Sequence, residues 1–356
     1  MSSFYLFEKD TFTLSGMKFG IIHDFRNPAQ WHRPYPALYQ ALLDQIVRAE
    51  ELGYDNVWLA EHHFTEDGYN PSTLPTAAAI AARTSRIRIG TYILLMPFQH
   101  PVRVAEDTTC IDIWSNGRFD LGAGQGYAAG EFHSLHIPRK ERSARLAEGV
   151  ELVRRLWTEE NVTFEGRFTQ VSDLTLSPRP VQQPHIPLWI GARADKAIRR
   201  VAQMGCHLMA TIGPDPAPLY IQTLRENGHD PAEFNIGQIR MVYVAENEEQ
   251  AWEDVQEHLH YSMQYYGVIL AEANDAPGDA DGWQFTHASQ LRDSGFGRAA
   301  MIGTPDQVAR KMEKFSQRFH CTHFVMGTQL PGLDSQKVTR SLELFAQEVL
   351  PAFRER

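Results

Sequence analysis

Short apolar runs alternate with longer amphipathic segments along most of the chain. Runs rich in β-branched and aromatic residues predict buried strands, and leucine, isoleucine and valine at spacings of three and four predict helices between them. A helix-sized segment after each strand indicates parallel βαβ units. The expected strands comprise residues 18–25, 56–60, 87–96, 118–122, 187–190, 207–212, 239–245 and 322–326.

Eight strands with intervening helices predict an α/β fold, namely a closed (β/α)8 TIM barrel that forms a single domain over residues 1–356. Residues 159–184 interrupt the alternation and predict an excursion between the fourth helix and the fifth strand. Residues 271–298 are rich in Gly, Asp and Ala, and we interpret them as an insertion between strands seven and eight that forms a mobile lid. The expected helices comprise residues 36–52, 75–83, 102–116, 139–158, 194–204 and 216–227.

The charge balance narrows the range of partners. The chain has 34 basic and 44 acidic residues and a net charge of −10, which argues against nucleic acid or an anionic membrane surface. The three cysteines are widely spaced and form no C-x-x-C pair, as is typical of a reducing compartment. The pattern shows neither a signal peptide nor a membrane span, so we expect a cytoplasmic protein.

Candidate chemistry follows the predicted strands, because active sites of such barrels lie at the C-terminal ends of the strands. Aromatic, imidazole and glycine groups gather there, which suits a flat, partly apolar ligand with a phosphate group. The residues at these strand ends are His23, Asp24 and Phe25 after strand one; Glu61, His62, His63 and Phe64 after strand two; Thr91, Tyr92, Met96 and Pro97 at strand three; Gly122, Gly124, Gln125, Gly126 and Tyr127 after strand four; Gly191, Ala192 and Arg193 after strand five; and Gly327, Thr328 and Gln329 after strand eight.

The adjacent histidines His62 and His63 raise the question of a metal site. Neighbouring residues on an extended chain point to opposite sides, so only one of the two can face the barrel mouth. The first strand carries no H-x-H pair, and no further His and Asp ligand set follows downstream. We therefore expect no metal site, and we interpret one histidine as a general acid or base that works near neutral pH.

Two glycine-containing turns are candidates for binding a phosphate or a ring. The turn at Gly191, Ala192 and Arg193 leads into a predicted helix, whose N-terminus and nearby arginine favour an anion, although a plain strand-to-helix turn has the same sequence. The segment 124–129 formally fits the dinucleotide pattern G-x-G-x-x-A. Glu148, the acidic residue about 20 positions on, lies inside a predicted helix instead of ending a strand, so we favour a loop that lies against a ring or phosphate.

Several sequence blocks together resemble a known family. They are GYDNVWLAEHHFTEDG (53–68), IGTYILLMPFQHPVRVAEDTTCID (89–112), GRFDLGAGQG (117–126) and PRPVQQPHIPLWIGA (178–192), joined by Glu131-Phe132, Phe164-Glu165-Gly166 and Gly303-Thr304-Pro305. In this order, they resemble the luciferase-like superfamily of flavin-dependent monooxygenases.

The resemblance implies a (β/α)8 enzyme, often a homodimer, that uses reduced FMN and molecular oxygen to oxidise a small organic substrate through a C4a-peroxyflavin. A separate flavin reductase would supply the reduced FMN, so that NAD(P)H acts only indirectly. His62 matches the family's catalytic histidine, and we expect Glu61 to orient it. Thr91 and Tyr92 match the strand end that lines the flavin ring, often with a non-proline cis peptide. The remaining cofactor contacts are expected from Gln125, Gly126 and Tyr127, and the phosphate contacts from Gly191, Ala192 and Arg193.

The chain departs from the luciferase catalytic subunit at two places. Gly124 and Gln125 stand where that subunit has a reactive cysteine and an arginine, and Ala192 and Ala194 replace hydroxyl residues at the phosphate turn. Light emission is therefore not expected. Two alternatives remain open: a deazaflavin-dependent oxidoreductase that transfers hydride on the same fold, and a non-catalytic flavin-binding partner subunit.

Overall fold

The predicted strands pair side by side, in chain order and in parallel, and the last pairs with the first to close a barrel. The computed structural model describes residues 16–210, 213–273 and 285–354. The closed ring confirms the predicted (β/α)8 barrel. Its strands are β1 (Lys18–His23), β2 (Asn56–Leu59), β3 (Arg88–Thr91), β5 (Phe119–Gly124), β8 (Leu188–Ala192), β9 (His207–Ala210), β10 (Ile236–Val244) and β12 (His323–Gly327).

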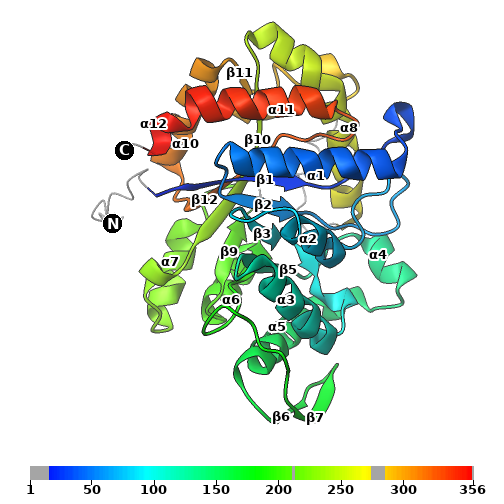
Figure 1. Ribbon diagram of the computed structural model, residues 1–356, viewed down its shortest axis with the longest axis vertical. Coiled ribbons are helices and arrows are strands. Elements are labelled where there is room, and N and C mark those ends of the chain that lie inside the picture. The colour runs from blue at the N-terminus through cyan, green and yellow to red at the C-terminus, as the bar shows by residue number, and fades with distance from the viewer. Residues whose placement is uncertain (1–15, 211–212, 274–284, 355–356) are drawn as a thin grey trace, which may run out of the picture.

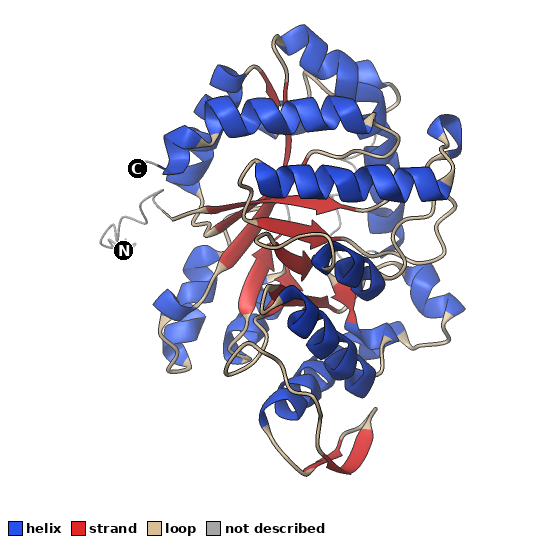
Figure 2. Cartoon of the chain, in the orientation of Figure 1, coloured by secondary structure: helices blue, strands red, loops and turns tan. Residues whose placement is uncertain are grey.

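Helices surround these strands, as Figures 1 and 2 show. Their apolar faces and the outward-facing strand residues, such as Phe19 and Val57, form the main hydrophobic core. Within the described ranges, no helix combines the length and hydropathy needed to cross a membrane. The main helices are α1 (Tyr35–Glu51), α2 (Thr73–Ala81), α3 (Pro101–Ser115), α5 (Arg142–Thr158), α6 (Asp195–Gln203), α7 (Ala217–Glu226), α8 (Glu248–Ala273), α10 (Pro305–Arg318) and α11 (Ser335–Leu344).

Large side chains fill the inside of the barrel, because strand residues alternate between its two faces. Trp58 and Trp189 pack there at right angles, with ring centroids 5.4 Å apart, and Met209 and Val325 complete this inner cluster. A Cβ atom at Gly90 would overlap with the Trp58 ring. The glycine therefore makes room on β3 for the tryptophan of β2.

The third predicted strand, 87–96, is divided in the structure. β3 ends at Thr91, a cis peptide bond joins Tyr92 to Ile93, and the two-residue strand β4 (Leu94–Leu95) then pairs with β5. The hydroxyl of Thr91 donates to the carbonyl oxygen of Gly122 (2.6 Å) and accepts from its N–H (2.9 Å). These bonds connect the end of β3 to β5 at the point where regular pairing of the two strands stops.

The excursion expected at 159–184 contains an antiparallel hairpin, β6 (Val162–Glu165) and β7 (Gln170–Leu174), which projects from the barrel (Figure 1). Glu148 of α5 holds its turn by accepting hydrogen bonds from the backbone N–H groups of Arg167, Phe168 and Thr169 at 2.7–3.2 Å. Glu148 therefore has a structural partner of its own in this protein.

The region between the seventh and eighth barrel strands contains more regular structure than its composition indicates. After β10, the 26-residue helix α8 continues to Ala273, and residues 274–284 of the expected lid lie outside the described residues. The short helix α9 (Gly295–Ala299) and strand β11 (Met301–Gly303), which pairs with β10, precede α10. A lid function for residues 271–298 stays a prediction.

Candidate active site

His62 occupies the mouth of the barrel, three residues beyond the end of β2. Its side chain is almost fully buried, and its ring packs edge-on against Tyr69 and Tyr127, with centroids 4.8 and 5.4 Å away. His63 points elsewhere: its ring lies 5.7 Å from Phe98 and its Nε2 atom lies 3.2 Å from Glu61. The two histidines therefore have separate surroundings, as the alternation of an extended chain predicts.

A chain of hydrogen bonds passes through the His62 ring. Nδ1 lies 2.8 Å from Oε1 of Glu131, and Nε2 lies 3.0 Å from the hydroxyl of Tyr127. Burial raises the pKa of Tyr127 well above its ordinary value, so its hydroxyl keeps its proton and donates to Nε2. The Nδ1–H group then donates to the Glu131 carboxylate. We assign this tautomer of His62 from its two partners.

Glu131, and not Glu61, orients His62. Glu61 accepts hydrogen bonds from the Thr73 hydroxyl (2.8 Å) and from the backbone N–H of Leu95 (3.1 Å), and it pairs with His63. The expected contact between Glu61 and His62 is wrong, because adjacent residues on the extended chain face opposite sides. Burial lowers the pKa of His63, but its contact with Glu61 outweighs this effect, so the net shift is upward.

Sequence reasoning gave Glu131 no role. Its only signal was the Glu131-Phe132 block, which resembles the family pattern but lies in the short helix α4 (Ala129–Ser134), far from His62 in sequence. The carboxylate also accepts the backbone N–H of His63 at 2.8 Å. Glu131 therefore fixes both the ring of one histidine and the main chain of the next.

Tyrosines from α8 also cover His62, and they belong to a helix that the sequence pattern did not predict. The ring centroids of Tyr265 and Tyr266 lie 5.9 and 6.5 Å from that of His62, and the hydroxyls of Tyr69 and Tyr266 lie 2.9 Å apart. Figure 1 shows α8 and α4 on the same side of the barrel, where the two helices contact each other. This aromatic enclosure keeps water away from the imidazole.

The expected flavin-lining pair, Thr91 and Tyr92, uses its hydroxyl groups inside the protein. The Tyr92 hydroxyl donates to the carbonyl oxygen of Ala210 (2.7 Å), and its ring packs against Trp58. Ile93, on the other side of the cis bond, lies directly over two glycines, and a Cβ atom at Gly124 would overlap with it. The surface at this point of the mouth is therefore the Ile93 side chain, which gives an apolar platform.

The loop after β5 divides its roles between packing and proton chemistry. Gly126 has a positive φ of 69° and lies against the ring of Phe132, while Gln125 is half-buried. Tyr127 points towards His62, so the residue expected to contact the cofactor also belongs to the hydrogen-bond chain. Gly124 ends β5 within the barrel wall, which is not the geometry of a dinucleotide-binding turn.

The expected phosphate turn lies between β8 and α6. Gly191 and Ala192 end β8, Arg193 is exposed, and Ala194 precedes α6 without a side-chain cap, which leaves the helix start open to an anion. Asp195 in the first turn opposes an anion there. The apolar platform and the uncapped helix start fit a flat ring with a phosphate. In the described part of the chain, no cluster of three His, Cys, Asp or Glu side chains is placed to hold a metal ion.

A (β/α)8 barrel with a buried carboxylate, imidazole and phenol in line at the C-terminal ends of its strands has the arrangement of an enzyme active site. The chain belongs to the family of luciferase-like monooxygenases, which it matches over residues 17–320. Its relatives are oxidoreductases, so this protein is an enzyme of the oxidoreductase class.

Three relatives illustrate the range of the family. The crystal structure of the monooxygenase RslO1 from Streptomyces bottropensis has a TM-score of 0.79 and 30% identity, with 95% of this chain and 100% of that chain covered. The oxygenase component of the flavin-dependent trigonelline monooxygenase of Acinetobacter baylyi is 26% identical over 338 residues (89% and 91% coverage). An F420-dependent glucose-6-phosphate dehydrogenase of Nakamurella multipartita is 28% identical over 323 residues (88% and 92% coverage).

Proposed function

We propose that this protein is a flavin-dependent monooxygenase that uses reduced FMN and molecular oxygen to oxidise a small organic substrate. The observation that carries the proposal is the buried chain from Glu131 through His62 to Tyr127 at the barrel mouth. The trigonelline relative, which is a flavin-dependent oxygenase component, supports the same reaction class.

Bound reduced flavin would supply the electrons that activate oxygen, and the protein's own residues have three tasks. The Ile93 platform and the turn from Gly191 to Arg193 would hold the ring and the phosphate. His62 and Tyr127 hold a proton on an uninterrupted path, with Glu131 fixing the direction of transfer. Tyr265 and its neighbours on α8 exclude water, which would otherwise compete with the substrate.

Three further parts of the proposal concern partners and location. We propose that a separate reductase delivers reduced FMN and itself consumes NAD(P)H; the name of the trigonelline relative, an oxygenase component, supports a division of the reaction between components. We also propose a homodimer in the cytoplasm. The F420-dependent relatives keep hydride transfer to or from a deazaflavin as a second candidate function.

Anaerobic titration of the purified protein with reduced FMN and with reduced F420 separates the two functions. We expect reduced FMN to bind at least tenfold more tightly, and we expect its reoxidation by oxygen to depend on the protein. Tighter binding of F420, together with flavin reoxidation at the rate of free FMN, would favour the dehydrogenase function instead.

The matched pair His62→Ala and His63→Ala tests the proton path. His62→Ala should slow the protein-dependent reoxidation of flavin by about tenfold or more while FMN still binds. His63→Ala should leave the rate near that of the wild type, because His63 points to Glu61 and away from the hydrogen-bond chain. Equal effects of the two substitutions would remove His62 from the mechanism.

A further inference from the structure

Arg26 is a buried cation whose hydrogen-bonding capacity is largely unused. It follows β1 at the C-terminal end of the barrel, its side chain is 0% exposed, and its Nε atom donates to Oδ2 of Asp67 at 2.6 Å. The amino groups Nη1 and Nη2 have no acceptor among the described residues, and Oδ1 of Asp67 has no donor among them. Buried donors without partners carry a large desolvation penalty, so they call for a physical explanation.

Other arginines show how this protein satisfies a guanidinium that has only a structural role. Arg88, at the opposite end of the barrel, donates from Nη1 to the Gly117 carbonyl and from Nη2 to Asp120. Arg118 donates from both amino groups to backbone carbonyls, including those of Ile87 and Thr84. Arg26 is more buried than Arg88, and neither of its amino groups has an acceptor among the described residues, which is the arrangement expected of a site for a bound molecule.

The groups around Arg26 connect it to His62. The guanidinium carbon lies 4.2 Å from the ring centroid of Tyr265 and 5.3 Å from that of Tyr69. The same two rings pack against His62, at 5.9 and 4.8 Å. Arg26 and His62 therefore share two tyrosine neighbours, and one small planar molecule among these rings would reach both.

We propose that Arg26 binds the carboxylate of an aromatic or heteroaromatic acid, which is the substrate of the proposed monooxygenase. The paired Nη1 and Nη2 donors match the two oxygens of a carboxylate, because a guanidinium fork binds such a group in a bidentate manner. The ring of the acid would pack against tyrosine faces beside His62. Asp24 does not occupy the fork, since its carboxylate accepts the backbone N–H of Arg26 at 3.2 Å.

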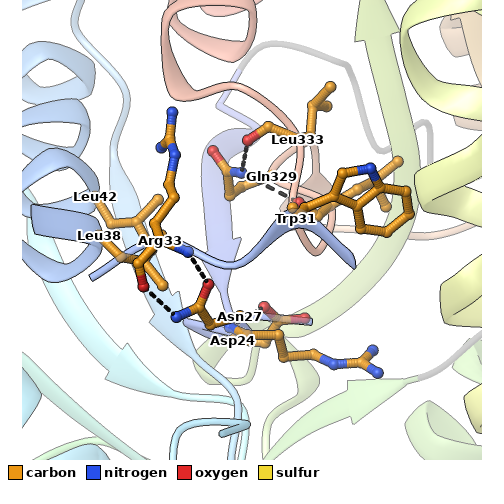
Figure 3. A pocket seen from close by; sticks show the side chains of 11 residues that line it. Asp24, Asn27, Trp31, Arg33, Leu38, Leu42, Gln329 and Leu333 are labelled. Atoms are coloured by element: carbon orange, nitrogen blue, oxygen red, sulfur yellow. Dashed lines mark hydrogen bonds between the residues drawn. The ribbon is translucent and has the colours of Figure 1, made fainter. Parts of the chain in front are cut away.

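Space for the ring would have to come from movement of a tyrosine of α8. A cavity of about 10 Å³ beside Arg26 is bounded by Asp24 and Asn27 on one side and by Gln329 and Leu333 on the other (Figure 3). This volume holds a water molecule and is too small for an aromatic ring. An acid bound to the fork would therefore have to displace the Tyr265 ring from the Arg26 guanidinium, and its own ring would then pack against Tyr69 beside His62.

Calorimetric titration of the flavin-free protein with benzoate and with benzamide tests the proposal without any turnover. The two probes have the same shape, and only benzoate carries a charge. We expect benzoate to bind the wild-type protein at least tenfold more tightly than benzamide. Arg26→Lys, which keeps the charge next to Asp67 but loses the fork, should weaken benzoate binding by about tenfold or more and leave benzamide unchanged.

Arg88→Lys is the control, because it alters a half-buried, carboxylate-paired arginine at the far end of the barrel and should leave benzoate binding unchanged. Circular dichroism verifies the fold of each variant. The comparison of the two probes on the wild-type protein needs no variant and decides the question if Arg26→Lys does not fold. Equal affinity for the two probes, no benzoate binding, or full benzoate binding by a folded Arg26→Lys protein would overturn the proposal and leave water as the partner of Arg26.

The acid-binding site rests on the proposed function in one respect, namely that the bound acid is the substrate of the monooxygenase. The two proposals can fail separately. A protein that binds benzoate through Arg26 but does not bind FMN would keep the acid-binding site and lose the monooxygenase function. A protein that binds FMN but distinguishes neither probe would keep the monooxygenase function and lose the acid-binding site.

Discussion

Replacement of Asp24 by asparagine is expected to stabilise the protein at neutral pH, although it removes a charge beside the active site. Asp24 follows β1, and its half-buried carboxyl group accepts the backbone N–H of Arg26. Burial, which outweighs the attraction of the Arg26 charge, raises the pKa of Asp24 to about 6. The folded state therefore favours the neutral acid, which an asparagine resembles in shape and charge.

The pKa fixes the sign and the pH range of the effect. The folded value of about 6 lies above the model value of 3.8, so the folded state holds this proton more tightly than the unfolded chain does. The contribution of Asp24 to stability is greatest below the unfolded pKa, falls as the pH rises from about 4 to about 6, and is constant above that range. The difference of about two units corresponds to at most ~3 kcal/mol, and solvent at the half-buried carboxyl reduces it to about 1–3 kcal/mol.

Urea unfolding of wild-type and Asp24→Asn protein at about pH 7.5 and about pH 4 measures this difference. The variant should be more stable at the higher pH and similar to wild type at the lower. Glu50→Gln is the control of opposite sign: burial raises the pKa of Glu50, but hydrogen bonds from the backbone of Ile87, Arg86 and Ser85 outweigh it and lower the pKa. That control should therefore lose stability at pH 7.5. A destabilised Asp24→Asn protein at pH 7.5, or an equal effect at both pH values, would refute the reasoning.

Three further substitutions test individual contacts. Glu131→Ala removes the acceptor of His62 Nδ1–H and should cost about 2–4 kcal/mol in urea unfolding, whereas Glu131→Gln, which keeps an acceptor oxygen, should cost about 1 kcal/mol. Gly90→Ala should cost about 1–3 kcal/mol because its methyl group overlaps with Trp58, and Trp58→Phe in the same chain should recover part of that loss in a double-mutant cycle. Glu148→Ala should speed proteolysis within the β6–β7 turn relative to wild type, because three backbone N–H groups lose their acceptor; an unchanged cleavage rate would show that the turn holds without it.

The barrel was predictable from the sequence because its strands are buried on both faces and read as continuous apolar runs. Strand β5 (Phe119–Gly124) ends two residues beyond the predicted strand 118–122. The predicted strand 87–96 differs most from the structure. There the apolar run continues through Ile93 and Leu94 while the backbone changes direction at Tyr92, and hydrophobicity alone does not record such a turn. Helix α8 was missed because its surface is mixed and no strand follows it directly.

The position of His62 at the barrel mouth was predictable, but its hydrogen-bond partners were not. His62 belongs to a recognisable block, and strand alternation correctly separates it from His63. The carboxylate that contacts His62 Nδ1 belongs to Glu131, 69 residues away in the sequence. Glu61 was predicted to orient His62 because it is the adjacent residue, but a sequence does not show the direction of a side chain. Gly124 is a second example of a contact that the sequence does not show. The Ile93 side chain occupies the space where a side chain at position 124 would lie.

The proposed acid-binding site depends on α8, a segment that the strand pattern does not describe. Tyr261 and Tyr265 are one helical turn apart on α8, so they share a face of the helix, and both lie against Arg26, at 5.0 and 4.2 Å. The lid expected at 271–298 overlaps only the end of this helix, whereas the described cover over His62 comes from Tyr265 and Tyr266. In the proposed function, loops of the barrel hold the Glu131–His62–Tyr127 chain, and α8 shapes the acid-binding site beside Arg26. Related barrels that keep the histidine block and differ in this helix are expected to differ in substrate more than in chemistry.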